Sequence, residues 1–155
     1  MKQKEPIKLE PQYITGIPGI DDQHTRLIAM CNSVLDNLEK KDVSFESVSA
    51  SVQEIVDELK SHFSTEESLM EMIGFPEIAG HKTQHEKLGK LFSEELKNLN
   101  KDVNAETSRS VCTMRDSELE HMAVYDIEYA IHIEKIISLR QKFNITALKA
   151  RTLTK

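Results

Sequence analysis

Residues 48–73 carry an unusually regular hydrophobic pattern. Along this segment one set of positions recurs at alternating steps of four and three, which predicts one face of a long amphipathic helix. These positions are Val48, Val52, Ile55, Leu59, His62, Glu66, Leu69 and Ile73. Such an alternation keeps one face toward partner helices, as in a helical bundle. Two polar residues, His62 and Glu66, lie on that face, so a bundle interior has to accommodate both.

Similar spacing predicts three further helices. One begins after Pro18-Gly19, and another follows the Gly74-Phe75-Pro76 turn and covers about 77–99. The last begins near Ala105 and continues at least to Phe143, after a short polar connection over 101–104. We therefore predict an all-α fold, an antiparallel up-down-up-down four-helix bundle formed by residues 19–143.

The two ends of the chain differ from this pattern. Pro6, Pro11 and Pro18 prevent the first 18 residues from forming one helix, so residues 1–18 are expected to be an extended N-terminal arm. Residues 144–155 are polar and compatible with a helix. We interpret them as a C-terminal tail or linker.

The composition excludes several classes of protein. The chain has 155 residues and a net charge of −6, without a basic stripe or an aromatic platform, so we expect no nucleic-acid binding. No apolar run has the length of a signal peptide or a membrane span, which favours a cytoplasmic protein without membrane association. Cys31 and Cys112 form no paired motif, which argues against a disulfide framework.

Seven ligand-type side chains fall on the predicted inner faces. They are His24, His62, Glu66, His81, His85, His121 and Asp126. The pairs His62-x-x-x-Glu66 and His81-x-x-x-His85 each place two side chains one turn apart on one face. Burying such groups without partners costs several kcal/mol each. Five imidazoles and two carboxylates exceed the four ligands that one zinc takes, and they suit two first-row metal ions bridged by carboxylates.

Other polar residues near this set are interpreted differently. His121 and Asp126 are turned by about 140° on an ideal helix, so we expect Asp126 to reach the metals from a different side. His132 lies about 16 Å further along and is interpreted as structural or surface. Glu67 is rotated away from the inner face and is not a ligand. Gln23 is predicted either to orient a ligand imidazole by a hydrogen bond from outside the metal site or to be a solvated residue in the first turn of its helix.

Four segments of the sequence resemble the hemerythrins, and particularly the bacterial hemerythrin domains. They are GIPGIDDQH, HFSTEESLM, GFPEIAGHKTQH and HMAVYD. The resemblance spans roughly residues 13–137 and includes all seven ligand positions in order. It implies one iron bound by three histidines and a second bound by two: His81, His85 and His121 for the first, His24 and His62 for the second.

The same resemblance implies how the two irons are linked and what they bind. Glu66, Asp126 and an oxo or hydroxo group would bridge them. The second iron would keep an open position, where dioxygen binds after taking electrons from both irons.

The sequence departs from this family just before His121. Family members commonly have Trp four residues before that histidine and an apolar residue three before it, where this chain has Ser117 and Glu118. The usual Ile after the histidine is Met122, whereas Phe63 matches the apolar wall of the oxygen pocket. We expect a wetter oxygen pocket or channel, with Glu118 as a solvated residue at its entry. Alternatively Glu118 approaches an iron, as a labile ligand or through a water, because Glu118-x-x-His121 has the spacing of ferritin-like di-iron sites.

These features favour a non-haem di-iron oxygen-binding domain that acts as an oxygen or redox sensor without catalytic turnover of its own. The last residues, ALKARTLTK, resemble the lead-in to a diguanylate cyclase domain, so a C-terminal signalling output domain is an expected partner besides dioxygen. Three alternatives stay open. They are a free-standing oxygen carrier or store, an oxidase or peroxidase-like enzyme that uses Glu118, and an iron centre that only holds the fold.

Overall fold

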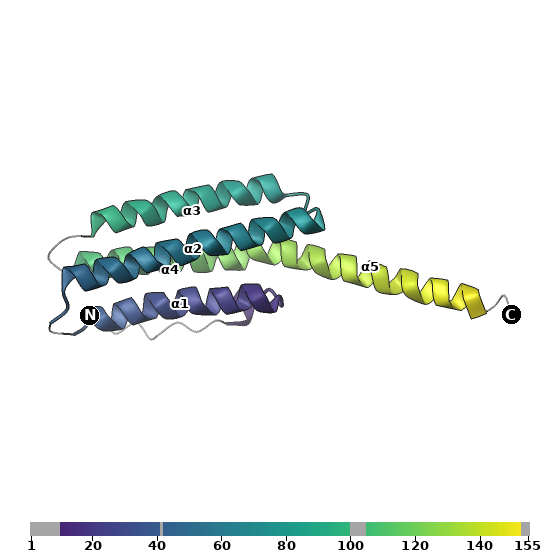
Figure 1. Ribbon diagram of the computed structural model, residues 1–155, viewed down its shortest axis with the longest axis horizontal. Coiled ribbons are helices and arrows are strands. Elements are labelled where there is room, and N and C mark those ends of the chain that lie inside the picture. Colours follow the sequence, from purple (N-terminus) through teal and green to yellow (C-terminus); the bar gives the residue numbers. More distant parts are fainter. Residues whose placement is uncertain (1–9, 41, 100–104, 153–155) are drawn as a thin grey trace.

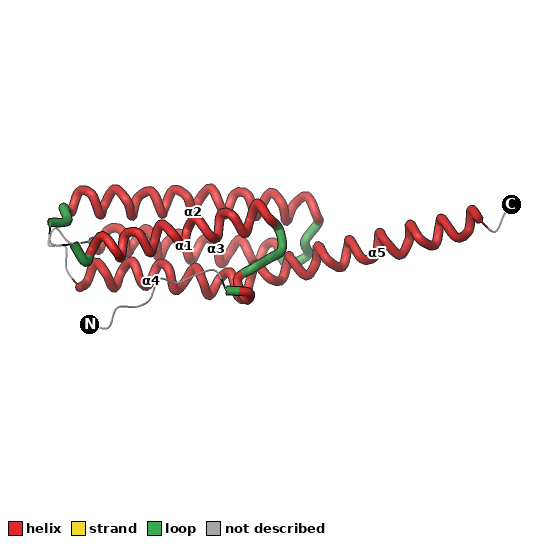
Figure 2. The backbone as a smooth tube through the Cα atoms, turned by 90° about the horizontal axis from the view of Figure 1, so that it is seen from below, coloured by secondary structure: helices red, strands yellow, loops and turns green. Residues whose placement is uncertain are grey.

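The described part of the chain forms four helical rods that lie side by side (Figure 1, Figure 2). The computed structural model describes residues 10–40, 42–99 and 105–152, with the backbone alone for 144–152. Three rods are single helices: α1 (Pro18–Leu38), α2 (Phe45–Ile73) and α3 (Ile78–Asn98). The fourth rod is continuous and consists of α4 (Ala105–His121), a π-helical segment η2 (Met122–Asp126) and α5 (Ile127–Thr152).

The predicted all-α four-helix bundle is confirmed. Helices α1 and α3 each pack against both α2 and α4, so the rods form a closed ring of neighbours. The predicted connection over 101–104 lies outside the described residues.

Local sequence signals fix both ends of α2. The Ser44 hydroxyl accepts a hydrogen bond from the Ser47 amide at 3.2 Å and caps the N-terminus. At the other end Gly74 adopts a left-handed conformation with φ of 63°. The Gly74 amide donates to the Glu71 carbonyl and the Phe75 amide to the Met70 carbonyl, which is the Schellman arrangement. This turn sends the chain back along α2 into α3.

The N-terminal arm contacts the bundle from residue 10 onward. It contains a short 3-10 helix, η1 (Pro11–Tyr13), and Tyr13 packs against the buried Ile28, Leu119 and Met122. The Asp21 carboxylate accepts hydrogen bonds from the amide and hydroxyl of Thr15, each at 2.8 Å. The first turn of α1 therefore holds the arm in place.

Apolar layers lie on both sides of the polar centre. The larger cluster includes Leu27, Ile55, Leu59 and Phe92 from three helices. The smaller one consists of Met70, Phe75 and Tyr129, at the end where α2 turns into α3. Along α2, the ligand positions 62 and 66 lie between the two clusters.

Helix α5 leaves the bundle and continues alone (Figure 1). Its last buried side chain among the described residues is Ala130. Ile131, Ile137, Leu139 and Phe143 are exposed. The helix has no break at the predicted boundary between residues 143 and 144. Among the described residues, no helix is both long and apolar enough to cross a membrane.

The turn at Gly74 generates a stability prediction. In Gly74→Ala, a Cβ would meet no neighbouring atom within 4 Å, so the cost comes from the left-handed backbone alone. We expect the free energy of unfolding of the metal-free protein to fall by about 1–2 kcal/mol. The control is Gly89→Ala, in the middle of α3, where an added Cβ also meets no atom within 4 Å and about 0.5–1 kcal/mol should be gained. Denaturant unfolding followed by circular dichroism measures both, and equal effects would contradict the prediction.

Candidate metal centre

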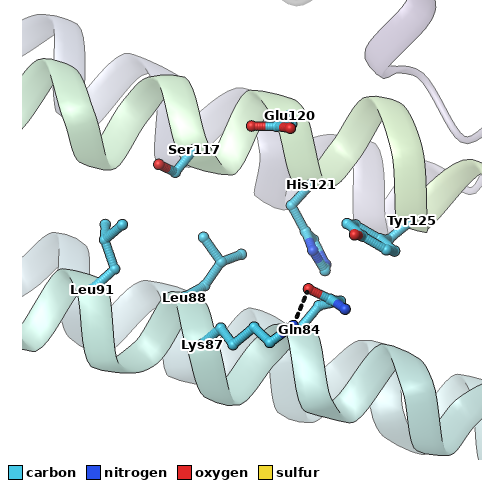
Figure 3. A pocket seen from close by; sticks show the side chains of 8 residues that line it. All are labelled: Gln84, Lys87, Leu88, Leu91, Ser117, Glu120, His121 and Tyr125. Atoms are coloured by element: carbon cyan, nitrogen blue, oxygen red, sulfur yellow. Dashed lines mark hydrogen bonds between the residues drawn. The ribbon is translucent and has the colours of Figure 1, made fainter.

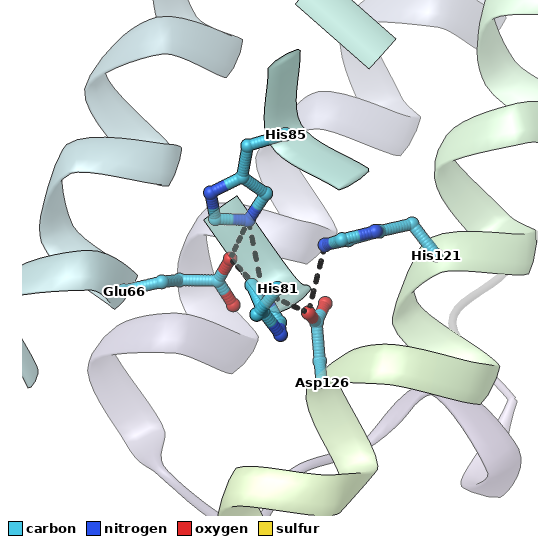
Figure 4. Close-up of side chains that lie close together, drawn as sticks. All are labelled: Glu66, His81, His85, His121 and Asp126. Atoms are coloured by element: carbon cyan, nitrogen blue, oxygen red, sulfur yellow. Dashed lines mark hydrogen bonds and ion pairs between the residues drawn. The ribbon is translucent and has the colours of Figure 1, made fainter. Parts of the chain in front are cut away.

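The structure brings all seven predicted ligand residues to one place inside the bundle. His24 comes from α1, the pair at 62 and 66 from α2, the pair at 81 and 85 from α3, His121 from α4 and Asp126 from η2. None of the seven is more than 3% exposed. Figure 4 shows five of them pointing toward one another from three helical rods.

Their donor atoms form two overlapping sets, and within each set all atoms lie within 4.8 Å of one another. The larger set contains Glu66, His81, His85, His121 and Asp126. The smaller set contains His24, His62, Glu66 and Asp126. The two carboxylates belong to both sets. This is the arrangement needed for two adjacent ions that share bridging carboxylates.

The spacing of the donors fits metal ligation. The Nε2 atoms of His81 and His85 lie 2.9 Å apart, and Nε2 of His121 lies 3.1 Å from Oδ1 of Asp126. Nε2 of His24 lies 3.2 Å from Oδ2 of Asp126. Two ligands at right angles on one ion, with bonds of about 2.1 Å, are separated by roughly 3 Å. The side chains are therefore already spaced as neighbours in a coordination shell.

Several of these atoms have no hydrogen-bond partner among the described residues, although they are fully buried. They include both ring nitrogens of His24 and His121, Nε2 of His62 and both carboxylate oxygens of Asp126. An unsatisfied buried polar group costs roughly 1–3 kcal/mol, and more when charged. Cations placed between the donors would satisfy the Nε2 atoms of His24, His62 and His121 and the oxygens of Asp126 together.

The π-helical segment explains the five-residue step from His121 to Asp126. We expected Asp126 to reach the metals from a different side than His121, because five residues turn an ideal α-helix past one face. The assumption of an ideal α-helix between these residues does not hold. Residues 122–126 adopt i→i+5 geometry, which widens the turn and returns Asp126 to the face of His121. A π-bulge is not visible in hydrophobic spacing alone.

Two hydrogen bonds from outside the cluster orient histidines. Nδ1 of His62 lies 3.1 Å from Oε1 of Gln23, and Nδ1 of His85 lies 2.9 Å from Oε1 of Glu67. When Nδ1 carries the proton and donates it, Nε2 is left as a free ligand atom facing the centre. Gln23 thus orients an imidazole as predicted. The sequence predicts only that Glu67 is not a ligand. Its position next to Glu66 was the signal that could have indicated its hydrogen bond to His85.

Tyr129 is a second residue whose role the sequence reasoning missed. Its hydroxyl donates a hydrogen bond of 2.5 Å to Oε1 of Glu66, and the ring is fully buried. A buried tyrosine normally finds a hydrogen-bond partner, and one turn separates Tyr129 from Asp126. These two facts could have indicated that the Tyr129 hydroxyl reaches the centre.

The electrostatics of the centre favour an ionised Glu66 beside a neutral His62. Burial alone would raise the pKa of Glu66, but His62, His81, His85 and Tyr129 bring it well below its usual value. Burial lowers the pKa of His62 to about 4, despite the nearby Glu66. A neutral imidazole and an ionised carboxylate are the forms that bind metal.

Side chains expected to form the oxygen pocket occupy two environments. The Phe63 ring stacks on His85 with centroids 3.9 Å apart, and Met122 is fully buried. Ser117 instead lines a pocket of about 220 Å³ between α3 and α4, which extends to His121 and Tyr125 (Figure 3). The space expected in place of the family's indole is present at this position.

The side chains of Glu118 and His132 are the two remaining predicted positions near the centre. The interpretation of Glu118 as a solvated channel residue is wrong, because its side chain is 3% exposed and does not line the pocket. The reason is its position on the helix: residue 117 faces the groove beside α3, and a one-residue step turns the next side chain into the bundle. His132 packs edge-on against Phe75 at 5.6 Å between ring centroids, as a structural residue.

The hydrogen bond between Glu67 and His85 generates a second prediction. Glu67→Ala removes the acceptor that orients His85, so we expect the affinity for metal to fall about 10- to 100-fold. Glu71→Ala is the matched control, since Glu71 shares the Lys82 contact with Glu67 but touches none of the ligand histidines. Competition with a chelator measures both affinities, and an equal loss in the two variants would contradict the prediction.

Comparison with known proteins agrees with this geometry. The family model of the hemerythrin HHE cation-binding domain matches residues 15–136. The bacteriohemerythrin of Stenotrophomonas maltophilia is 41% identical over 71 residues, which cover 46% of this chain and 45% of that protein. The bacteriohemerythrin of Methylococcus capsulatus is 27% identical over 121 residues, covering 76% of this chain and 88% of that protein. The chain thus aligns with about half the length of some curated relatives and most of others.

Solved structures show the same fold. A crystal structure of a hemerythrin with one leucine replaced by alanine superposes with a TM-score of 0.70, at 22% identity, over 80% of this chain and 94% of that one. Hemerythrin domains bind a di-iron centre, and the buried cluster of histidines and carboxylates fits the ligation of iron. The fold, the family model and the donor set lead to one conclusion: this chain belongs to the hemerythrin family.

Proposed function

We propose that this chain is a non-haem di-iron domain that binds dioxygen and serves as an oxygen or redox sensor. The observation that carries the proposal is the pair of unequal donor sets that share Glu66 and Asp126. Unequal sets favour one ion with a full complement of protein ligands beside one with room for a further ligand. An open position is what a reactive metal site requires.

The proposed assignment follows the two sets. His81, His85 and His121 hold one iron, His24 and His62 hold the other, and Glu66 and Asp126 bridge them together with an oxo or hydroxo group. When bound, the iron pair supplies the electrons for reversible oxygen binding.

The surrounding residues position the ligands and exclude water. Tyr129 fixes one oxygen of Glu66 by hydrogen bonding, and Gln23 fixes the ring of His62. The Phe63 ring covers the centre with apolar surface, because it lies against His62, His85 and His121. Ordered ligands and a mostly dry wall favour binding over turnover, which supports a non-catalytic role for the domain.

Two features favour a sensor over a long-lived carrier. The pocket at Ser117 extends to His121, so water can approach one end of the centre, and water promotes loss of bound oxygen with oxidation of the iron. In addition, the helix that carries His121 and Asp126 continues as α5 beyond the bundle, where a signalling output domain could be attached. Such an output domain, of the diguanylate cyclase kind, is part of the proposal.

The first test is an oxygen cycle on the whole chain. The iron-loaded protein should contain about two irons per chain. After anaerobic reduction and exposure to air, we expect visible absorption that decays within minutes, because the pocket admits water. A chain with one iron or none would refute the di-iron site. Absorption that is stable for many hours would refute the sensor and favour an oxygen carrier.

A substitution at the pocket tests its part in this behaviour. Ser117→Trp should fill the pocket of about 220 Å³ and slow the decay about tenfold or more, because water then reaches His121 less easily. Glu120→Gln is the control, since it lines the same pocket and leaves its volume nearly unchanged. An unchanged decay rate in Ser117→Trp, with normal iron content, would show that this pocket is not the route of water.

A further inference from the structure

The carboxylate of Glu118 is buried without any hydrogen-bond partner among the described residues. Its side chain is 3% exposed, and neither of its oxygens receives a hydrogen bond. Burying an unpaired carboxyl group costs several kcal/mol in any protonation state. An apolar side chain at this position would avoid that cost. A glutamate therefore calls for a partner that the protein side chains do not provide.

The neighbourhood of Glu118 identifies the partner as a cation. Oε1 of Glu118 lies 3.7 Å from Nε2 of His62, and this nitrogen also has no hydrogen-bond partner among the described residues. Both atoms therefore face the same space. Glu118 lies outside the four-donor set, and rotation about its own side-chain bonds can bring an oxygen closer to the position that Nε2 faces.

The count of donors points to the same side of the centre. Five protein donors surround one ion position and four surround the other. His62, which lies next to Glu118, belongs to the four-donor set. A further carboxylate there would give both ion positions five protein donors.

We propose that Glu118 is a third carboxylate ligand of the centre and binds the iron held by His24 and His62. This inference rests on the di-iron site proposed above and adds to it the ligand that occupies the open position. Dioxygen or a small anion has to displace Glu118 in order to bind. An additional negative ligand also stabilises the higher oxidation state of the iron pair, so it favours rapid oxidation in air.

Anion binding to the oxidised iron protein provides a direct test, with azide as the probe. Glu118→Gln removes the charge at nearly constant shape, and Glu118→Leu introduces an apolar side chain. We expect both variants to bind azide at least tenfold more tightly than the wild type, as measured by visible absorption titration. We also expect a higher reduction potential in both. Glu106→Gln is the matched control, because this glutamate is exposed on the same helix near its other end and should leave both quantities unchanged.

A crystal structure of the iron-loaded wild type provides a readout that depends on no variant. A Glu118 oxygen at bonding distance from the iron supports the proposal, and a water between them overturns it. Equal azide affinity in wild type and in iron-loaded Glu118 variants also overturns it, and leaves the di-iron site intact. A wild-type chain that does not hold two irons overturns the site and this inference together.

Discussion

The requirement to satisfy buried charge governs this bundle. Two carboxylates and five imidazoles lie together in a largely apolar interior, and most of their inward atoms have no hydrogen-bond partner among the described residues. Apolar clusters on both sides of the centre stabilise the packing of the helices. They provide no hydrogen bonds or charges for the polar groups between them. The fold therefore requires cations at its centre, and neighbouring residues position the donor atoms by hydrogen bonds. Tyr129, Gln23 and Glu67 each hold one ligand from outside.

Much of this arrangement could be predicted from the sequence because both signals are periodic. Hydrophobic spacing predicted the helices, and polar residues on the same faces predicted the ligands. The signals of Ser44 and Gly74 located the ends of α2. What the sequence did not reveal depends on departures from periodicity or on single contacts. The π-helical turn before Asp126 is one, and the hydrogen bonds of Tyr129 and Glu67 are others. Spacing places a residue on a face without identifying its partner.

Two adjacent substitutions separate this chain from the usual hemerythrin pattern, and the structure assigns them opposite environments. Ser117 faces the groove between α3 and α4, where a small side chain leaves a pocket. Glu118 faces inward and is sequestered from solvent. We propose that the first change alters the access of water to the centre and that the second alters the charge and the reduction potential of the centre.

The π-helical turn also has a mechanical consequence. It joins the rod inside the bundle to α5, and it carries Asp126 at its end. A π-turn holds one residue more than an α-turn, so its conversion to regular α-helix would rotate everything beyond it by about 100° and shift it by about 1.5 Å. Helix α5 is a single unbroken helix that extends to Thr152. A small change in the backbone at Asp126 would thus rotate the C-terminal end of α5 through a large angle.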